Sequence, residues 1–248
     1  AFFKGFGAFA EKIVLPAHMA FQIPKNFPHH IAAGVFMVYG TSYHALVQRA
    51  NINKDDEVLV LGAAGGVGLA AVDIAKSFGA RVVAAVSTKE KAEVCMGYGV
   101  DDVVVYGEEK LDKEGQKAFT KKLKSKSVRG GFSIIYDPIG DCFAEPALRS
   151  IGWGGTYLVV GFAAGKIPSF PANLMLLKGC AVSGVFIGRF QQEEPKKNTQ
   201  NLKAIGELLE GKRLTPFISE TIPMSGCIGA IERIAKRGVV GKVVFVND

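Results

Sequence analysis

An apolar run that ends in a cluster of glycines constrains the fold of this chain more than any other feature. The run occupies residues 58–61, the cluster Gly-Gly-Val-Gly lies at 65–68, and a helical pattern starts at Leu69. A strand that is apolar on both faces is typical of a parallel sheet. Glycines at a strand-to-helix turn let backbone N–H groups approach a phosphate at the positive end of the helix. We therefore predict that this turn binds a dinucleotide.

Glycine clusters also occur in ordinary turns, so the surrounding sequence decides between the two interpretations. The predicted helix over 69–78 ends at Gly79, and a second apolar strand follows over 81–86. The cluster therefore lies within a strand–helix–strand unit of roughly 30 residues, which is the context that a dinucleotide site requires.

The residues after the second strand indicate which dinucleotide binds. An NAD site places Asp or Glu about 20 residues beyond the glycines, whereas this strand is followed by Ser87, Thr88 and Lys89, with Lys91 close behind. A small hydroxyl residue and lysines suit an added 2′-phosphate, which a carboxylate would repel. The alternative is a helix capped by Ser87 or Thr88 with solvated lysines. Both can hold together, and we favour NADP over NAD.

Alternating strand and helix patterns predict an α/β fold. Strands are expected near 58–62, 81–86, 103–106, 132–137, 155–161 and 180–186, with helical patterns between most of them. This order is typical of a six-stranded, doubly wound parallel sheet of the Rossmann type. Flanking it we expect a strand over 7–16, helices over 28–38, 41–50, 198–210 and 225–237, and a final strand over 242–246.

Composition excludes several classes of protein. The chain is 48% hydrophobic and has 30 glycines among 248 residues, which fits a buried sheet rather than disorder. Its net charge of +7 is not accompanied by the interleaved aromatic and basic residues that stack on bases, so no nucleic acid partner is expected. No apolar run reaches the length of about 18 residues that spans a membrane.

The cysteines and the first residues suggest a compartment. Cys95, Cys142, Cys180 and Cys227 are widely separated, without metal-binding spacing, as expected for small apolar groups in a reducing environment. The first residues do not have the pattern of a signal peptide. We expect a soluble intracellular protein, in either the cytoplasm or the mitochondrial matrix.

Five motifs together resemble one known family. They are Thr-Ser-Tyr-His-Ala-Leu at 41–46, Ala-Ala-Gly-Gly-Val-Gly at 63–68, Tyr-Asp-Pro-Ile-Gly at 136–140, Val-Gly-Phe-Ala-Ala-Gly at 160–165 and Gly-Lys-Val-Val at 241–244. The combination is similar to the zinc-independent quinone oxidoreductase branch of the medium-chain dehydrogenase/reductases, the relatives of zeta-crystallin. Residues 161–178, with Gly-Arg-Phe at 188–190, especially resemble its quinone oxidoreductase-like 2 subgroup. The likeness covers essentially the whole chain.

The resemblance implies where NADPH would bind. The diphosphate would lie on Ala64, Gly65, Gly66, Val67 and Gly68. The 2′-phosphate pocket would consist of Ser87, Lys91 and Tyr106, completed by Arg237. Taken singly, Tyr106 is more often a strand-end aromatic and Arg237 more often a solvated helix end, but together they favour a phosphate pocket.

The nicotinamide half is assigned by the same resemblance. Thr41 corresponds to a threonine near the nicotinamide-side phosphate or ribose. The ring would be lined by Gly161, Phe162, Ala163, Gly184, Val185 and Phe186 at the carboxyl edge of the sheet. Plain core packing is the alternative for Phe162 and Phe186. Asp137 with Gly140 is expected to cap the following helix rather than to act in catalysis.

A zinc site is not expected. Met37 stands where zinc-dependent relatives carry a metal-ligating cysteine, and methionine is a poor Zn²⁺ ligand. The four histidines, His18, His29, His30 and His44, lack a cysteine or carboxylate at metal spacing.

The resemblance also implies a division of the chain. Residues 1–27 would be a remnant of an N-terminal, GroES-like catalytic domain, 28–212 the dinucleotide-binding domain, and 213–248 a segment that returns to the catalytic domain. Most of the catalytic domain of complete family members has no counterpart here.

Two functions therefore stay open. The first is an NADPH-dependent reductase that transfers hydride to a quinone or activated alkene. The second is a catalytically idle subunit with a structural or regulatory role in a larger assembly, possibly mitochondrial. We expect a homodimer through the strand at 180–186, or a subunit of a larger complex.

Overall fold

Six parallel strands form the central sheet. The computed structural model describes residues 7–17, 20–23, 25, 27–236 and 238–247. The strand order is β3-β2-β1-β4-β5-β6, which confirms the predicted doubly wound sheet. The strands are β1 (Glu57–Leu61), β2 (Arg81–Val86), β3 (Asp102–Val105), β4 (Phe132–Asp137), β5 (Ile151–Val159) and β6 (Ala181–Gly184).

Alternate residues of the central strands face two separate apolar layers. In β1, Val58 and Val60 belong to one layer, and Leu59 and Leu61 to the other. All four are fully buried, which explains why the strand reads as a continuous apolar run.

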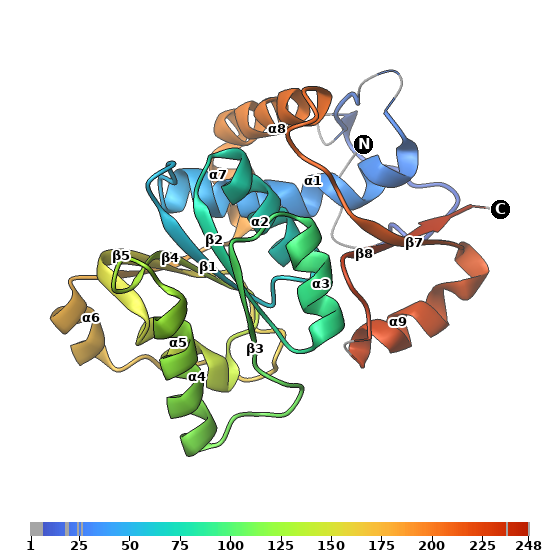
Figure 1. Cartoon of the computed structure of the whole chain (residues 1–248). Helices are drawn as coiled ribbons and strands as arrows, with labels where there is room; N and C mark the ends of the chain where they lie inside the picture. Colours follow the sequence, from blue (N-terminus) through green and yellow to red (C-terminus); the bar gives the residue numbers. More distant parts are fainter. Residues whose placement is uncertain (1–6, 18–19, 24, 26, 237, 248) are drawn as a thin grey trace.

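Helices cover both faces of the sheet (Figure 1). The first layer is covered by α1 (His29–Tyr43), α2 (Gly66–Ser77), α3 (Lys89–Gly97) and α8 (Pro195–Glu210). The second is covered by α4 (Lys113–Lys126), α5 (Ala144–Leu148) and α6 (Ala172–Lys178), with the short turn η3 (Asp141–Phe143) before α5. In the part of the chain that the structure describes, no helix is both long and apolar enough to cross a bilayer.

The last part of the chain forms a small unit outside the main sheet. It contains β7 (Ile218–Pro223), η4 (Met224–Gly226), α9 (Cys227–Ala235) and β8 (Lys242–Val246), and β7 pairs with β8 in parallel. Figure 1 shows this unit beside the sheet, near the start of α1. We call residues 214–246 the closing segment.

Two predictions about the first part of the chain are wrong. Residues 7–16 form no strand, because β7 and β8 pair with each other and Phe9 instead packs edge-on against Phe245, at 4.9 Å between ring centroids. The two predicted helices form one continuous helical segment: α1 passes through Gly40 and runs on after Tyr43 into a π-helix, η2 (His44–Arg49). Burial of α1 against the sheet outweighs the cost of about 1 kcal/mol that a glycine brings to a helix interior.

Two strand boundaries also differ from the prediction. β5 begins at Ile151, four residues early, because a register shift against β4 between Phe132 and Ile134 accommodates the glycines that follow Ile151. β6 ends at Gly184, and α7 (Ile187–Glu193) begins three residues later with Phe186 as its N-cap. The carboxyl edge of the sheet is therefore lined by short loops.

Candidate functional site

The glycine turn joins β1 to α2 at the carboxyl edge of the sheet. Gly62 adopts a left-handed conformation with φ of 56°, and Gly65 is the N-cap residue of α2. The Gly65 N–H donates to the Gly62 carbonyl at 3.0 Å, which closes the turn. The first N–H groups of a helix have no acceptor within the helix. The amides of residues 66–68 therefore present donors, and the positive end of the helix dipole, at this edge.

Close packing explains two of the glycines. A Cβ atom at Gly68 would lie 2.4 Å from the Gly62 carbonyl oxygen, and one at Gly66 would lie 2.7 Å from Cδ of Lys242. The first clash is with backbone and cannot be relieved by a side-chain rotation. Gly68 therefore lets α2 approach the end of β1.

Gly62 was missed by the sequence analysis, although a signal for it existed. Residues 62, 65 and 68 are all glycine. In the structure both Gly65 and Gly68 pack against the Gly62 carbonyl. The side chain of Ile139 occupies the space beside Gly62, where a Cβ atom would lie 2.7 Å from it.

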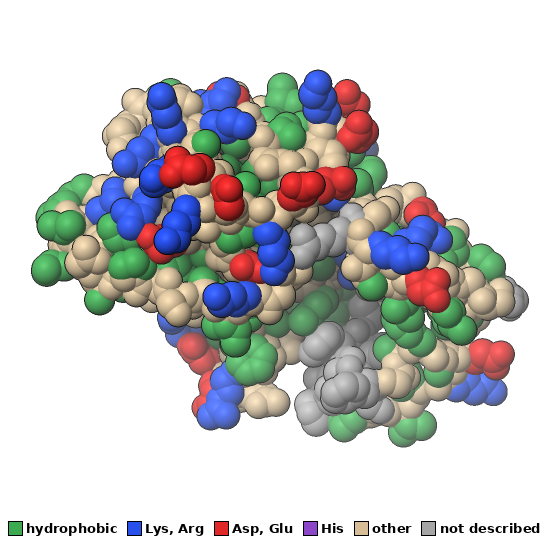
Figure 2. Space-filling model, turned by 90° about the horizontal axis from the view of Figure 1, so that it is seen from below, with side chains coloured by type: hydrophobic (Ala, Val, Ile, Leu, Met, Phe, Trp, Pro, Cys, Tyr) green, Lys and Arg blue, Asp and Glu red, His purple; other side chains and the backbone are tan. Residues whose placement is uncertain are grey.

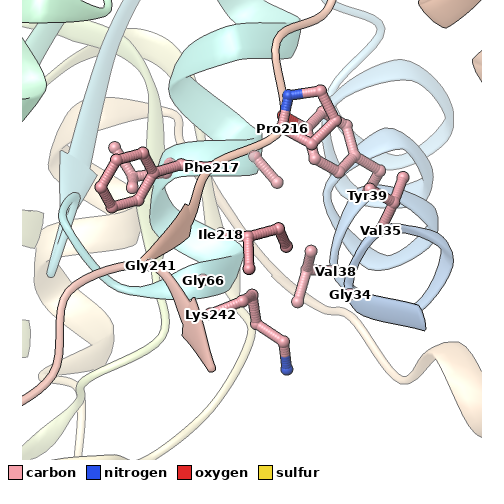
Figure 3. Close-up of a pocket in the computed structure, with 12 residues that line it drawn as sticks. Gly34, Val35, Val38, Tyr39, Gly66, Pro216, Phe217, Ile218, Gly241 and Lys242 are labelled. Atoms are coloured by element: carbon pink, nitrogen blue, oxygen red, sulfur yellow. The ribbon is translucent and has the colours of Figure 1, made fainter. Parts of the chain in front are cut away.

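The closing segment completes one wall of the turn. The Gly241 N–H donates to the Ala64 carbonyl at 2.8 Å, and Gly241 forms a parallel bridge with Gly65. The Lys242 side chain passes over Gly66, and Figure 3 shows its ammonium pointing away from Ile218 and Val38. Burial lowers the pKa of Lys242. Lys242 was part of a recognised motif but was given no role by sequence, because its position depends on the return of the chain to the turn.

Ser42 supports the turn from α1. Its hydroxyl donates to the Val67 carbonyl at 2.9 Å and lies 2.8 Å from the Tyr136 hydroxyl. The predicted neighbour Thr41 is buried, and its hydroxyl donates to the Met37 carbonyl of its own helix at 2.7 Å. Nothing in the sequence distinguished Ser42 from Thr41 as the residue that contacts the turn.

Ser87 and Lys91 meet at the end of β2. The Lys91 ammonium donates to the Ser87 hydroxyl at 3.0 Å, while Thr88, rather than Ser87, caps α3 and accepts from the Lys91 N–H at 3.3 Å. A cation and a hydroxyl are thus available together at a helix start, which suits a phosphate.

Tyr106 contacts the end of β2 through its backbone. Its N–H donates to the Val86 carbonyl at 3.0 Å, and its ring packs against Phe143 and Phe119, at 4.7 and 5.6 Å between centroids. Arg237 lies outside the described residues.

Asp137 holds the loops that follow β4 and β5. Its Oδ1 accepts from the N–H groups of Ile139 and Gly140 at 2.8 and 2.9 Å, and its Oδ2 accepts from the Tyr157 hydroxyl at 2.6 Å. Its backbone carbonyl accepts from the N–H of Gly161 at 3.3 Å. Burial raises the pKa of the Asp137 carboxyl. The residue therefore organises the edge of the sheet by closing the turn after β4. It does not cap the following helix as expected, because η3 has Gly140 as its N-cap and no side-chain cap.

The residues predicted around the nicotinamide ring lie along this same edge. Ala163 donates its N–H to the Pro138 carbonyl at 3.1 Å, and Val185 donates to the Val159 carbonyl at 2.9 Å. Val185 is buried, whereas Phe162 is 40% and Phe186 73% exposed. Core packing is therefore not the role of these two rings in this chain.

The described histidines and cysteines are scattered over the fold. Within the described residues, no three His, Cys, Asp or Glu side chains are placed to hold a metal. His18 lies outside the described residues. His44 is buried and its ring stacks on Phe190. Its Nδ1 is hydrogen-bonded to the Gln48 Oε1 at 2.8 Å.

The chain is similar to known dehydrogenases and reductases. The family model described as zinc-binding dehydrogenase matches residues 66–204. The chain is 33% identical to the quinone oxidoreductase-like protein 2 homolog of Nematostella vectensis and 34% identical to quinone oxidoreductase-like protein 2 of Bos taurus. These matches cover 96% and 97% of this chain but 64% and 67% of the relatives.

A solved structure extends the likeness to three dimensions. The quinone oxidoreductase of Thermus thermophilus, also solved in complex with NADPH, superposes with a TM-score of 0.83 at 26% identity. The match covers 98% of this chain and 75% of that one.

We predict that Gly68→Ala destabilises the protein by about 1–3 kcal/mol, because the new methyl group collides with backbone. Gly206→Ala in α8 is the matched control, since a Cβ atom there meets nothing within 4 Å. The control should stabilise by about 0.5–1 kcal/mol. Chemical denaturation measures both. Equal stability of the two variants would show that the close approach at Gly68 is not a constraint.

Proposed function

Because this chain belongs to the quinone oxidoreductase branch of the medium-chain dehydrogenase/reductase superfamily, we propose that it is an NADPH-binding reductase of the quinone reductase type. The observation that carries the proposal is the contact between Lys91 and Ser87, one strand away from the glycine turn. This arrangement supports the proposal, because it would offer separate places for a diphosphate and a 2′-phosphate on one edge of the sheet.

The glycine turn would hold the diphosphate. Gly66, Val67 and Gly68 offer backbone N–H groups at the start of α2. Gly65 closes the turn beneath them, and Ala64 supports the turn through Gly241. The cation of Lys242 would add a charge-assisted contact, because its side chain crosses the first turn of the helix. Binding an anion there would also favour the charged form of an ammonium that burial otherwise disfavours.

The nicotinamide half would lie toward β4, β5 and β6. Gly161 lets the loop after β5 pack closely on the loop after β4, since a Cβ atom there would lie 3.1 Å from the Pro138 carbonyl oxygen. Phe162 and Phe186 would shield the ring from water, and Ala163 and Val185 would complete the wall. Thr41 is proposed to act here through the placement of α1, because its hydroxyl is already engaged.

The bound cofactor supplies the hydride, and the protein supplies position and a dry surface. An acceptor that receives hydride without an acid–base triad suits this edge, so a quinone or an activated alkene is the proposed substrate class. The reaction is proposed to be zinc-independent, on the ground that the described His, Cys, Asp and Glu side chains do not converge.

We also propose a division of the chain into a cofactor-binding part and two flanking segments. Residues 28–212 would bind the cofactor, whereas 1–27 and 213–248 would pack with a catalytic domain. Support comes from α9, where Ile228, Ile231 and Ile234 are 70%, 47% and 50% exposed.

NADPH oxidation assayed with a panel of quinones distinguishes the two functions: turnover supports the reductase, and binding without turnover supports an idle subunit.

We predict that the chain binds NADPH more tightly than NADH, by about tenfold to a hundredfold, because charged hydrogen bonds to a phosphate contribute about 1.5–3 kcal/mol. Lys91→Glu should abolish or reverse this preference. Lys122→Glu makes the same charge change on the exposed surface of α4 and should leave it intact. Isothermal titration with both cofactors tests the prediction, and equal affinities in the unmodified chain would refute the assignment of Ser87 and Lys91.

A homodimer through β6 is also proposed. This strand is an edge of the sheet, and Trp153, Leu176, Leu177 and Phe186 nearby are 69–83% exposed. Val185 donates its N–H inward to Val159, so by strand alternation the Val182 N–H points to the open edge.

We expect sedimentation velocity at micromolar concentration to give a dimer. Val182→Pro should give a monomer, because proline removes a donor from the open edge without removing one from the β5–β6 pairing. A monomer in the unmodified chain, or a dimer of unchanged affinity in the variant, would contradict pairing through β6.

A further inference from the structure

A carboxylate is buried on the face of α2 that packs into the first apolar layer. Asp73 is only 7% exposed, and its neighbours along the helix are buried apolar residues. A charged group in such a place costs free energy unless polar partners compensate it, and burial raises the pKa of the Asp73 carboxyl. Its Oδ2 accepts from the Tyr39 hydroxyl at 2.6 Å and from the Thr215 N–H at 2.7 Å. Asp73 therefore ties α1 and α2 to the first residues of the closing segment.

The same peptide region is held from a third helix. The hydroxyl of Tyr98, the C-cap residue of α3, donates to the Thr215 carbonyl. Its ring also meets Phe217 edge-on, at 6.4 Å between centroids and 87° between planes. Asp73 and Tyr98 thus fix both the N–H and the carbonyl of Thr215.

The placement of Thr215 is passed on to the glycine turn through Phe217. Gly241 has a φ of 63°, and the Phe217 ring fills the space where its Cβ atom would lie, 2.4 Å away. The next residue, Ile218, pairs with Lys242. Figure 3 shows Phe217 and Ile218 beside Gly241, Gly66 and Lys242. The contacts that hold Thr215 therefore also position Gly241 and Lys242.

We propose that Asp73, together with Tyr39 and Tyr98, is a positioning set that holds the closing segment so that Lys242 meets the diphosphate of the dinucleotide. This inference rests on the proposed function of the glycine turn. None of the three residues contacts the cofactor in this account. Each acts on it through Thr215 and the β7–β8 pairing.

A double-mutant cycle on NADPH affinity tests the coupling. Asp73→Ala and Lys242→Met should each weaken binding about tenfold, the size of one lost hydrogen bond or charge contact. The double variant should bind NADPH at most about twofold more weakly than either single variant, because a misplaced Lys242 has no contact left to lose. A double variant weakened about a hundredfold, which is simple additivity, would overturn the proposal.

Two further variants separate positioning from general damage. Asp73→Asn keeps an oxygen that can accept from both Tyr39 and Thr215, so its affinity should stay within about twofold of the unmodified chain. Tyr98→Phe removes only the contact to the Thr215 carbonyl and should weaken binding by about threefold. Asp112→Ala, which removes an exposed cap of α4, should have no effect. An Asp73→Asn variant as weak as Asp73→Ala would overturn the hydrogen-bonding role.

A measurement without cofactor keeps this inference separate from the proposed function. Hydrogen exchange at the Gly241 amide reports its bond to the Ala64 carbonyl in the free protein. In Asp73→Ala and Tyr98→Phe the exchange rate should rise, by about tenfold in the first. An unchanged rate in both variants would overturn the positioning set even if NADPH binds. Failure of NADPH to bind the unmodified chain, with the exchange result intact, would overturn only the proposed function.

Discussion

The contact of α2 with the end of β1 is the constraint on which the rest of the structure depends. It exists because Gly68 has no Cβ atom that would collide with the Gly62 carbonyl, 2.4 Å from that position. The approach aims the free amides of the first helical turn along the carboxyl edge of the sheet. It also sets the height at which Ser42 reaches the Val67 carbonyl from α1. A bulkier residue at this one position would displace the helix and the groups that pack on it.

The closing segment turns this local feature into a site with two sides. Gly241 bonds to Ala64, and Lys242 crosses the helix start, so a cation from the end of the chain joins amides from the first strand–helix connection. The second cation, Lys91, lies one strand away beside Ser87. Figure 2 views the molecule from below and shows Lys and Arg side chains interspersed with Asp and Glu side chains on that face. Local placement, rather than the net charge of +7, makes the edge suitable for phosphates.

The sheet and the glycine turn could be predicted from sequence because their signals are local: continuous apolar strands, and glycines at the strand end. The Ser87–Lys91 contact is likewise a matter of four residues along one helix start. Ser42 and Asp73 could not be predicted, because their partners Val67 and Thr215 lie 25 and 142 residues away. The strand expected over 7–16 failed for a related reason, since a strand needs a partner edge and β7 and β8 use each other.

In the proposed complex, the amides at the start of α2 bind the diphosphate while Ser87 and Lys91 bind the 2′-phosphate. Titration of the isotope-labelled chain with NADPH, followed by the backbone amide resonances in NMR spectra, tests both halves in one experiment. We expect the largest shifts at Gly66, Val67 and Gly68 and at residues 87–91. Titration with NADH should move only the first group at comparable concentration. Largest shifts away from both groups, or none at millimolar NADPH, would contradict the account.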